Sequence, residues 1–104
     1  MKELQMKQAE INTACGFETH LVGLGLGISA ETGELVDYLA KITNFKKPKP
    51  SDDLTNLKQK IGYECADVLV YLLQIANELN FDLEKVYLEK CEKLLERHNK
   101  TLLV

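Results

Sequence analysis

The sequence predicts an all-α protein built as a four-helix bundle. In two long segments, apolar residues recur at alternating steps of three and four residues, which is the spacing of one face of a helix. No segment shows the sustained alternation of apolar and polar residues, rich in β-branched side chains, that a strand would need. Both prolines, Pro48 and Pro50, fall in one short stretch, where they interrupt the helical pattern.

The first two expected helices precede these prolines. The first covers about 2–14 and ends before Gly16, because glycine readily takes the left-handed conformation that closes a helix. The second covers about 18–44, and its apolar stripe includes one carboxylate, Glu31. Glycine is unfavourable inside a helix, so three glycines in this segment indicate the close approach of another helix: Gly23, Gly25 and Gly27.

The other two expected helices follow the prolines. The third covers about 53–79, and its apolar seam lies at positions 61, 65, 68, 72, 75 and 79. Asn80 is expected to end this helix in a left-handed conformation, and Asp82 is expected to cap the fourth helix, which covers about 83–98. We therefore expect 1–104 to form one helical domain, which a partner subunit could complete.

Composition and charge argue against several classes of protein. The 104-residue chain has a net charge of −3 and a pI near 5.4, so it lacks the positive field that would bind nucleic acid. Its longest apolar stretch is far shorter than the roughly 20 residues of a membrane span, and we expect a cytoplasmic protein without membrane association. Cys15, Cys65 and Cys91 form no C-x-x-C pair, which argues against a zinc knuckle and predicts buried, reduced thiols.

Four acidic residues are the strongest indication of chemistry. Glu31 and Glu34 are three residues apart and project from one helix face, and Glu64 and Asp67 repeat this spacing on the third expected helix. We expect the four carboxylates to face each other across the bundle. Uncompensated charges in a partly dry interior cost on the order of several kcal/mol each, so the cluster predicts a divalent cation. Taken singly, either pair would more often be two solvated acids on an exposed face, and it is the combination of both pairs with a glutamate in an apolar stripe that favours the metal site.

The set of donor atoms indicates which metal is expected. Oxygen ligands without cysteine or histidine suit a hard ion, Mg²⁺ or Mn²⁺, which completes its coordination with water and phosphate oxygens. A di-iron bundle would need Glu-x-x-His motifs, but at that spacing His20 follows Phe17 and His98 follows Leu95. We therefore expect phosphate chemistry at a magnesium site.

At these motifs the sequence resembles the MazG-like all-α nucleotide pyrophosphohydrolases, whose hallmark is E-x-x-E, a spacer, and then E-x-x-D. Here the motifs read Glu31-Thr32-Gly33-Glu34 and Glu64-Cys65-Ala66-Asp67. The similarity continues through 30–35, 67–73 and 83–97, and it covers roughly 21–98. Two features depart from the family: glycines common around the second motif are replaced, and 90–94 lacks an asparagine that the last helix often carries.

The resemblance implies the NTP pyrophosphohydrolase fold and Mg²⁺-dependent cleavage of nucleoside triphosphates to the monophosphate and pyrophosphate. It also implies subunits that assemble as homodimers or homotetramers. Carried over to this chain, the metal ligands are Glu31, Glu34, Glu64 and Asp67. Glu34 and Glu64 are the catalytic candidates, and Glu34 is the first candidate for accepting a proton from the attacking water.

Several side chains are candidates for binding the substrate. Tyr71 lies four residues after Asp67 on the same helix face, where its ring could stack on a base or pack in the core. Cations that could hold the outer phosphates lie in the proline-containing stretch and on the last expected helix: Lys46, Lys47, Lys90, Lys93 and Arg97. Taken singly, each of these cations is more often a solvated surface residue.

Two other functions are compatible with the sequence. The chain could be a non-catalytic helical dimerisation or regulatory module, whose acids hold a structural metal or are simply solvated. It could also be an enzyme acting on another phosphorylated metabolite with a diphosphate bond, because an acid cluster recognises the metal and phosphate rather than the base. The sequence predicts neither the base nor the sugar of a nucleotide substrate.

Overall fold

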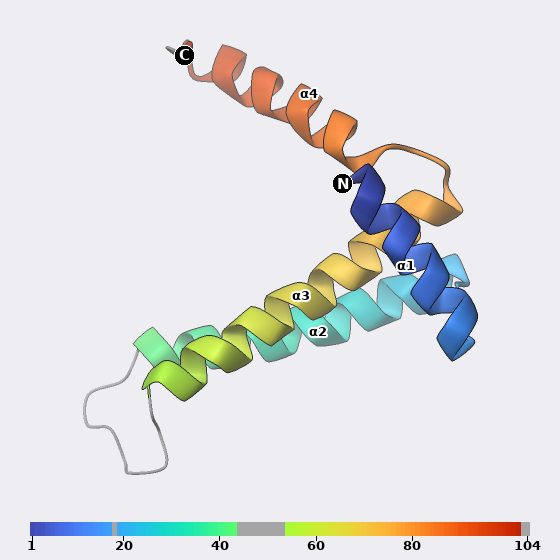
Figure 1. Ribbon diagram of the computed structural model, residues 1–104. Helices are drawn as coiled ribbons and strands as arrows, with labels where there is room; N and C mark the ends of the chain where they lie inside the picture. Colours follow the sequence, from blue (N-terminus) through green and yellow to red (C-terminus); the bar gives the residue numbers. More distant parts are fainter. Residues whose placement is uncertain (18, 44–53, 103–104) are drawn as a thin grey trace.

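A computed structural model of the protein describes residues 1–17, 19–43 and 54–102. These residues form four helices (Figure 1). They are α1 (Lys2–Cys15), α2 (Leu21–Thr43), α3 (Leu54–Glu78) and α4 (Leu83–Arg97). No described residue belongs to a strand. The predicted all-α fold is confirmed, and the helix ends lie within a few residues of the expected ones.

The helix ends have the local chemistry that the sequence predicts. Gly16 closes α1 with a φ of 64°, and Asn80, just after α3, has a φ of 56°. The Phe81 amide donates to the carbonyl oxygen of Ala76 at 3.0 Å, which satisfies a free carbonyl at the end of α3. Asp82 caps α4, because its side chain accepts a hydrogen bond of 3.3 Å from the Lys85 amide.

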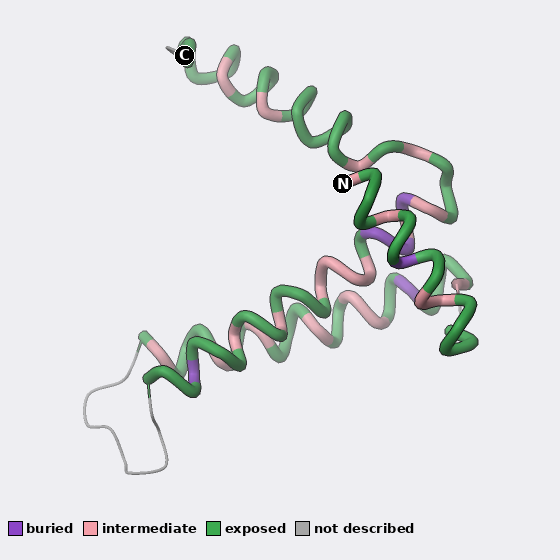
Figure 2. The backbone as a smooth tube through the Cα atoms, in the orientation of Figure 1, coloured by how far each residue is buried: buried purple, intermediate pink, exposed green. Residues whose placement is uncertain are grey.

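The long helices α2 and α3 lie side by side and run in opposite directions, and α1 crosses the end of α3 that also carries Ala76 (Figure 1). Among the described residues, the buried apolar side chains are few: Leu24, Leu57, Leu73 and Ala76. Most buried positions gather where α1 meets the other two helices (Figure 2). The α2–α3 pair is therefore positioned along its length by half-buried side chains, and the acids lie among them.

A network of amide side chains joins α1 to α3. Gln8 and Gln74 are each only 4% exposed, and the Nε2 atoms of both donate to Asn12 Oδ1 at 2.9 Å. Nearer the start of α1, Gln5 Nε2 donates to Asn77 Oδ1 at 3.2 Å, and Asn77 Nδ2 donates back to the Gln5 carbonyl oxygen at 2.9 Å. Buried polar groups need such partners, so these bonds fix the position of α1 on α3.

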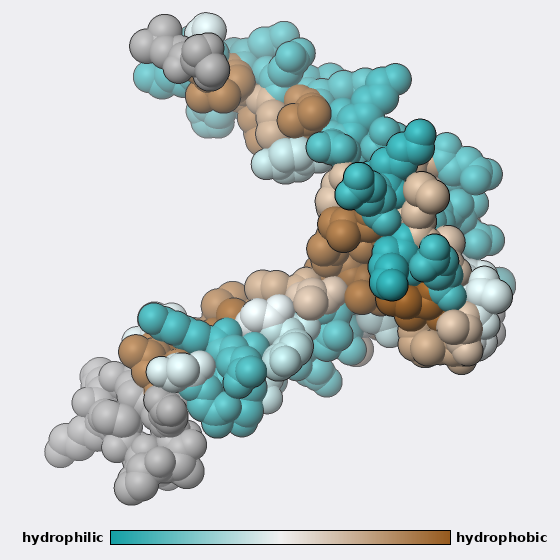
Figure 3. Space-filling model, viewed as in Figure 1, coloured by the Kyte–Doolittle hydropathy of each residue, from teal (hydrophilic) through white to brown (hydrophobic). Residues whose placement is uncertain are grey.

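Helix α4 points away from the α2–α3 pair and, among the described residues, does not pack along another helix (Figure 1). Its first turn is tied to α1: the Leu83 amide donates to Gln5 Oε1 at 2.9 Å, and the Met1 amino group pairs with Glu84 at 3.0 Å. Apolar side chains on α4 remain exposed, as the brown patches along it in Figure 3 indicate. They include Val86, Tyr87, Leu88 and Leu94.

One expectation about burial holds only in part, and another is wrong. Of the expected apolar seam of α3, alternate members are half-buried (Ile61, Val68 and Ile75), whereas Cys65, Leu72 and Leu79 are exposed, and the buried Leu57 and Leu73 lie outside the seam. Helix α3 has apolar residues on two faces, and spacing alone does not tell which face meets α2. The cysteines are free, but Cys15 and Cys65 are exposed and Cys91 is half-buried, so the thiols are not core residues of the single chain.

Candidate metal centre

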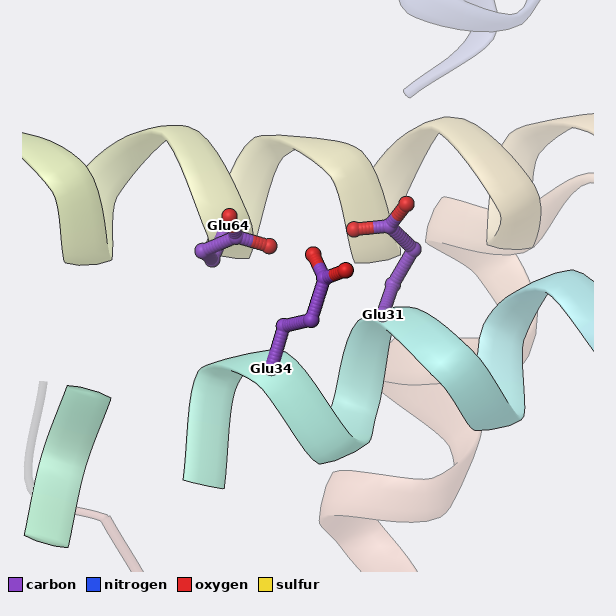
Figure 4. Close-up of side chains that lie close together, drawn as sticks. All are labelled: Glu31, Glu34 and Glu64. Carbon is purple, nitrogen blue, oxygen red and sulfur yellow. The ribbon is translucent and has the colours of Figure 1, made fainter. Parts of the chain in front are cut away.

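Three glutamates from α2 and α3 converge between the two helices. Glu31 and Glu34 lie one turn apart on α2, and Glu64 lies on α3, directed towards them (Figure 4). One carboxylate oxygen from each residue lies within 4.8 Å of the corresponding oxygen of the other two. The expected convergence of E-x-x-E with the first acid of E-x-x-D is therefore present in the structure.

The cluster is partly removed from solvent. Glu31 and Glu64 are half-buried, and Glu34 is exposed. The Oε2 atoms of Glu31 and Glu64 are buried and have no hydrogen-bond partner. A buried carboxylate oxygen without a donor is unfavourable, so both oxygens are free to bind a group that the chain itself does not supply.

The electrostatics of the cluster show the same lack of compensation. Loss of hydration raises the pKa of Glu64 to about 7, with further contributions from the neighbouring carboxyl group of Glu31 and from the charge of Glu34. The pKa of Glu31 is also raised, first by loss of hydration and then by the charges of Glu34 and Asp67, and the neighbouring carboxyl group of Glu64 opposes this shift. No described lysine, arginine or histidine forms an ion pair with the three glutamates.

A hard divalent cation fits this arrangement. It would be held by carboxylate oxygens only, which is the donor set that Mg²⁺ and Mn²⁺ prefer, and it would compensate the charges that now raise the two pKa values. The two unpartnered Oε2 atoms, on Glu31 and Glu64, come from different helices, so the ion would also link α2 to α3.

Asp67 is not part of this three-residue cluster. It lies one turn beyond Glu64 on α3, its side chain is exposed, and its charge still acts on Glu31. It borders the same cavity as Glu31. Asp67 is thus near enough to influence the centre, and its predicted role as a metal ligand stays a prediction.

A cavity of about 430 Å³ opens beside the acids. Its wall contains Phe17 and residues of α2 and α3: Gly23, Leu24, Glu31, Asp67, Val70, Tyr71 and Gln74. The Tyr71 ring lies against Gly27, where a β-carbon would collide with it, so this glycine permits the close approach of the helices that the sequence predicted. Sequence reasoning missed Gln74 as a cavity residue, although its position seven residues after Asp67 places both on one helix face.

The predicted phosphate-binding cations of α4 are not brought to the acids within one chain. Lys90, Lys93 and Arg97 are exposed on α4, which points away from the cluster (Figure 1). Lys46 and Lys47 lie outside the described residues. Of the expected substrate-binding side chains in the described ranges, only Tyr71 borders the cavity.

Comparison with protein families decides which family this arrangement represents. The model of the MazG nucleotide pyrophosphohydrolase domain matches residues 22–102. The chain belongs to the MazG family. The MazG match includes both acid motifs, and it indicates a hydrolase of the nucleotide pyrophosphohydrolase type. Neither the curated proteins nor the solved structures contain a significant match to the chain.

In the described part of this MazG domain, no helix has both the length and the apolar character needed to cross a membrane.

Proposed function

We propose that the protein is a Mg²⁺-dependent nucleoside triphosphate pyrophosphohydrolase, which converts a ribo- or deoxyribonucleoside triphosphate and water to the monophosphate and pyrophosphate. The observation that carries this proposal is the three-glutamate cluster with two buried, unpartnered oxygens. It lies within the segment that matches the MazG domain and beside a cavity large enough for part of a nucleotide.

In this proposal Glu31, Glu34, Glu64 and Asp67 hold the Mg²⁺, or Mn²⁺ in its place. The bound ion would neutralise phosphate charge and so stabilise the charge that develops during hydrolysis. Glu34 is the exposed member of the cluster and can accept a proton from the attacking water. Glu64 lies beside Glu34 in the cluster, and we propose it as the second catalytic residue.

The remaining proposed contacts bind the substrate. Tyr71 borders the cavity and offers its ring to the sugar or base. Lys46, Lys47, Lys90, Lys93 and Arg97 are proposed to bind the outer phosphates, which the acids would otherwise repel. Because α4 points away from its own acid cluster, we assign its three cations to the site of a second copy in a homodimer or homotetramer. The exposed apolar side chains of α3 and α4 support such an assembly.

Pyrophosphate release from a panel of ribo- and deoxyribonucleoside triphosphates with Mg²⁺ tests the proposal. We expect one monophosphate and one pyrophosphate per turnover, and a loss of rate of about 100-fold or more in Glu34→Gln and in Glu64→Gln. Glu78→Gln, an exposed position at the end of the same helix as Glu64, is the matched control and should retain the native rate.

The absence of turnover with every nucleotide would contradict this function. The non-catalytic dimerisation or regulatory module would then be the better description. In that case Mg²⁺ should still raise the melting temperature if the acids form a structural site, while a triphosphate should add nothing to the shift.

A further inference from the structure

We propose that the cavity beside the acid cluster receives the nucleobase of the substrate, and that Gln74 recognises the base by accepting a hydrogen bond from one of its N–H groups. This inference rests on the proposed function, because it takes the ligand of the acid cluster to be a nucleotide. It adds a specificity-determining residue that the acid motifs do not include.

The first argument is the state of the Gln74 side chain. Gln74 is 4% exposed, its Nε2 is bonded to Asn12 Oδ1 at 2.9 Å, and its Oε1 is buried without any partner. A desolvated acceptor of this kind is unfavourable until a donor reaches it. Asn12 already accepts from the amide nitrogen, so the oxygen is the polar atom of this side chain that is left to bind an incoming group.

The second argument is the hydrogen-bond network that holds this amide. Asn12 Oδ1 accepts from Gln74 and also from Gln8, at 2.9 Å in each case. While Asn12 keeps this orientation, turning the Gln74 amide over would place its oxygen against the oxygen of Asn12, and two acceptors repel each other. In this network the amide atom of Gln74 that is left without a partner is the carbonyl oxygen, and Gln74 is one of the residues that border the cavity.

The third argument is the position of the cavity relative to the acids. Glu31 and Asp67 border one part of it, and Gln74, seven residues after Asp67, lies about 10 Å further along α3. That length leaves room for a pentose between a phosphate held at the acids and a base held at Gln74. Leu24 and Val70 give the intervening wall an apolar surface suited to a flat ring.

The ligand class follows from this chemistry. The occupant is a planar heterocycle that offers an N–H donor, joined through a short linker to a phosphate at the acid cluster. A bare sugar phosphate satisfies the acids but leaves Gln74 Oε1 without a partner. The structure therefore predicts that base-bearing phosphates bind more tightly than the same sugar phosphate without a base.

Binding of compounds that lack a phosphoanhydride bond tests this inference independently of catalysis. We would titrate the full chain with Mg²⁺ and each of the four common deoxynucleoside 5′-monophosphates, with deoxyribose 5-phosphate as the base-free reference. The variant is Gln74→Met, which keeps the size of the side chain and removes the acceptor. Gln8→Met is the matched control, because Gln8 is equally buried and donates to the same Asn12 oxygen but does not border the cavity.

We expect at least one monophosphate to bind the native chain more tightly than deoxyribose 5-phosphate, and Gln74→Met to weaken it by about tenfold. Gln8→Met should keep the native preference for the base, and deoxyribose 5-phosphate should bind all three chains equally. The inference is wrong if Gln74→Met binds the monophosphates as tightly as the native chain does. It is also wrong if the substitution weakens the binding of deoxyribose 5-phosphate as much as it weakens the binding of the monophosphates.

The outcome is separable from that of the proposed hydrolysis. Base-dependent binding that is lost in Gln74→Met, in a chain that releases no pyrophosphate, would retain the base site and reject the hydrolase. Pyrophosphate release with no preference for base-bearing ligands would retain the hydrolase and reject the base site.

Discussion

At the scale of single residues, Glu64 combines a half-buried position with the nearby negative charges of Glu31 and Glu34. Its pKa is raised from 4.5 to about 7, so the metal-free chain holds a proton there that an unfolded chain would release near pH 4.5. A bound divalent cation would displace this proton, because a metal ligand has to be deprotonated. The stability of the protein and its affinity for Mg²⁺ should therefore both depend on pH.

We expect the free energy of unfolding of the metal-free protein to fall as the pH rises. Between pH 4.5 and about 7 the folded chain binds more protons than the unfolded chain, so raising the pH in this window favours unfolding. Melting temperatures measured with a chelator at several pH values check this. In Glu64→Gln the contribution of Glu64 to this pH dependence should disappear. If the melting temperature of Glu64→Gln fell with pH as steeply as that of the native chain, the raised pKa would not belong to Glu64.

The affinity for Mg²⁺ should change in the opposite direction. Protons compete with the ion at Glu64 below about pH 7, so Mg²⁺ should bind more tightly as the pH rises through this value. Titration calorimetry at pH 6 and pH 8 measures the difference. Glu78→Gln should bind like the native chain, and an affinity independent of pH would show that Glu64 does not bind the ion.

At the scale of helices, the approach of α3 to α2 depends on Gly27. A methyl group there would collide with the Tyr71 ring, whereas at Gly25 and Gly33 it would meet nothing within 4 Å. We expect overpacking in Gly27→Ala to destabilise the fold by about 1–3 kcal/mol. The higher helix propensity of alanine should offset part of this loss. The matched variant Gly33→Ala should stabilise the fold by up to about 1 kcal/mol. Urea unfolding measures both, and equal effects would contradict the tight contact.

The attachment of α1 to α3 should depend on Asn12. Its Oδ1 accepts hydrogen bonds from two nearly buried glutamines, so Asn12→Leu leaves two buried donors without a partner. We expect a loss of about 1–3 kcal/mol of stability in urea unfolding. Thr13→Ala, an exposed neighbour on the same helix, should change stability by less than about 0.5 kcal/mol.

These elements also show what the sequence could predict. The spacing of apolar residues predicted four helices, and Gly16, Asn80 and Asp82 predicted three of their ends, because periodicity and capping are local properties. Spacing could not choose the inward face of α3, which carries apolar residues on two faces. The amide network around Asn12 depends on how α1 crosses α3, and no local pattern encodes that crossing.

The candidate site was predictable to a similar extent. The i, i+3 spacing brought out Glu31, Glu34 and Glu64, and the structure places them together. The spacing could not predict that Asp67 lies outside this cluster, because the direction of its side chain depends on how α3 is rotated about its own axis relative to α2. The role proposed for Gln74 could not be foreseen, since an unpartnered buried oxygen is visible only in three dimensions.

At the scale of the whole molecule, α4 is the helix that, within the described part of a single chain, does not pack along another helix. It exposes Tyr87 at 63% and Leu88 at 55%, and α3 exposes a second apolar edge at Leu72 and Leu79. Covering such surfaces is a common reason for symmetric association. In the homodimer or homotetramer that we propose, these surfaces would be covered, and the cations of one α4 would lie at the acids of another chain.

Mixing two inactive variants tests whether the site is shared between chains. One chain carries Glu34→Gln with a native α4, and the other carries Lys93→Ala and Arg97→Ala with native acids. If α4 serves the acids of a partner, mixed oligomers contain a site with intact acids and intact cations, and part of the native pyrophosphate release should return. Because each chain alone contains only half of such a site, subunit exchange is required for this recovery. If α4 served the acids of its own chain, the mixture would stay as inactive as its components, since no chain in it carries both halves.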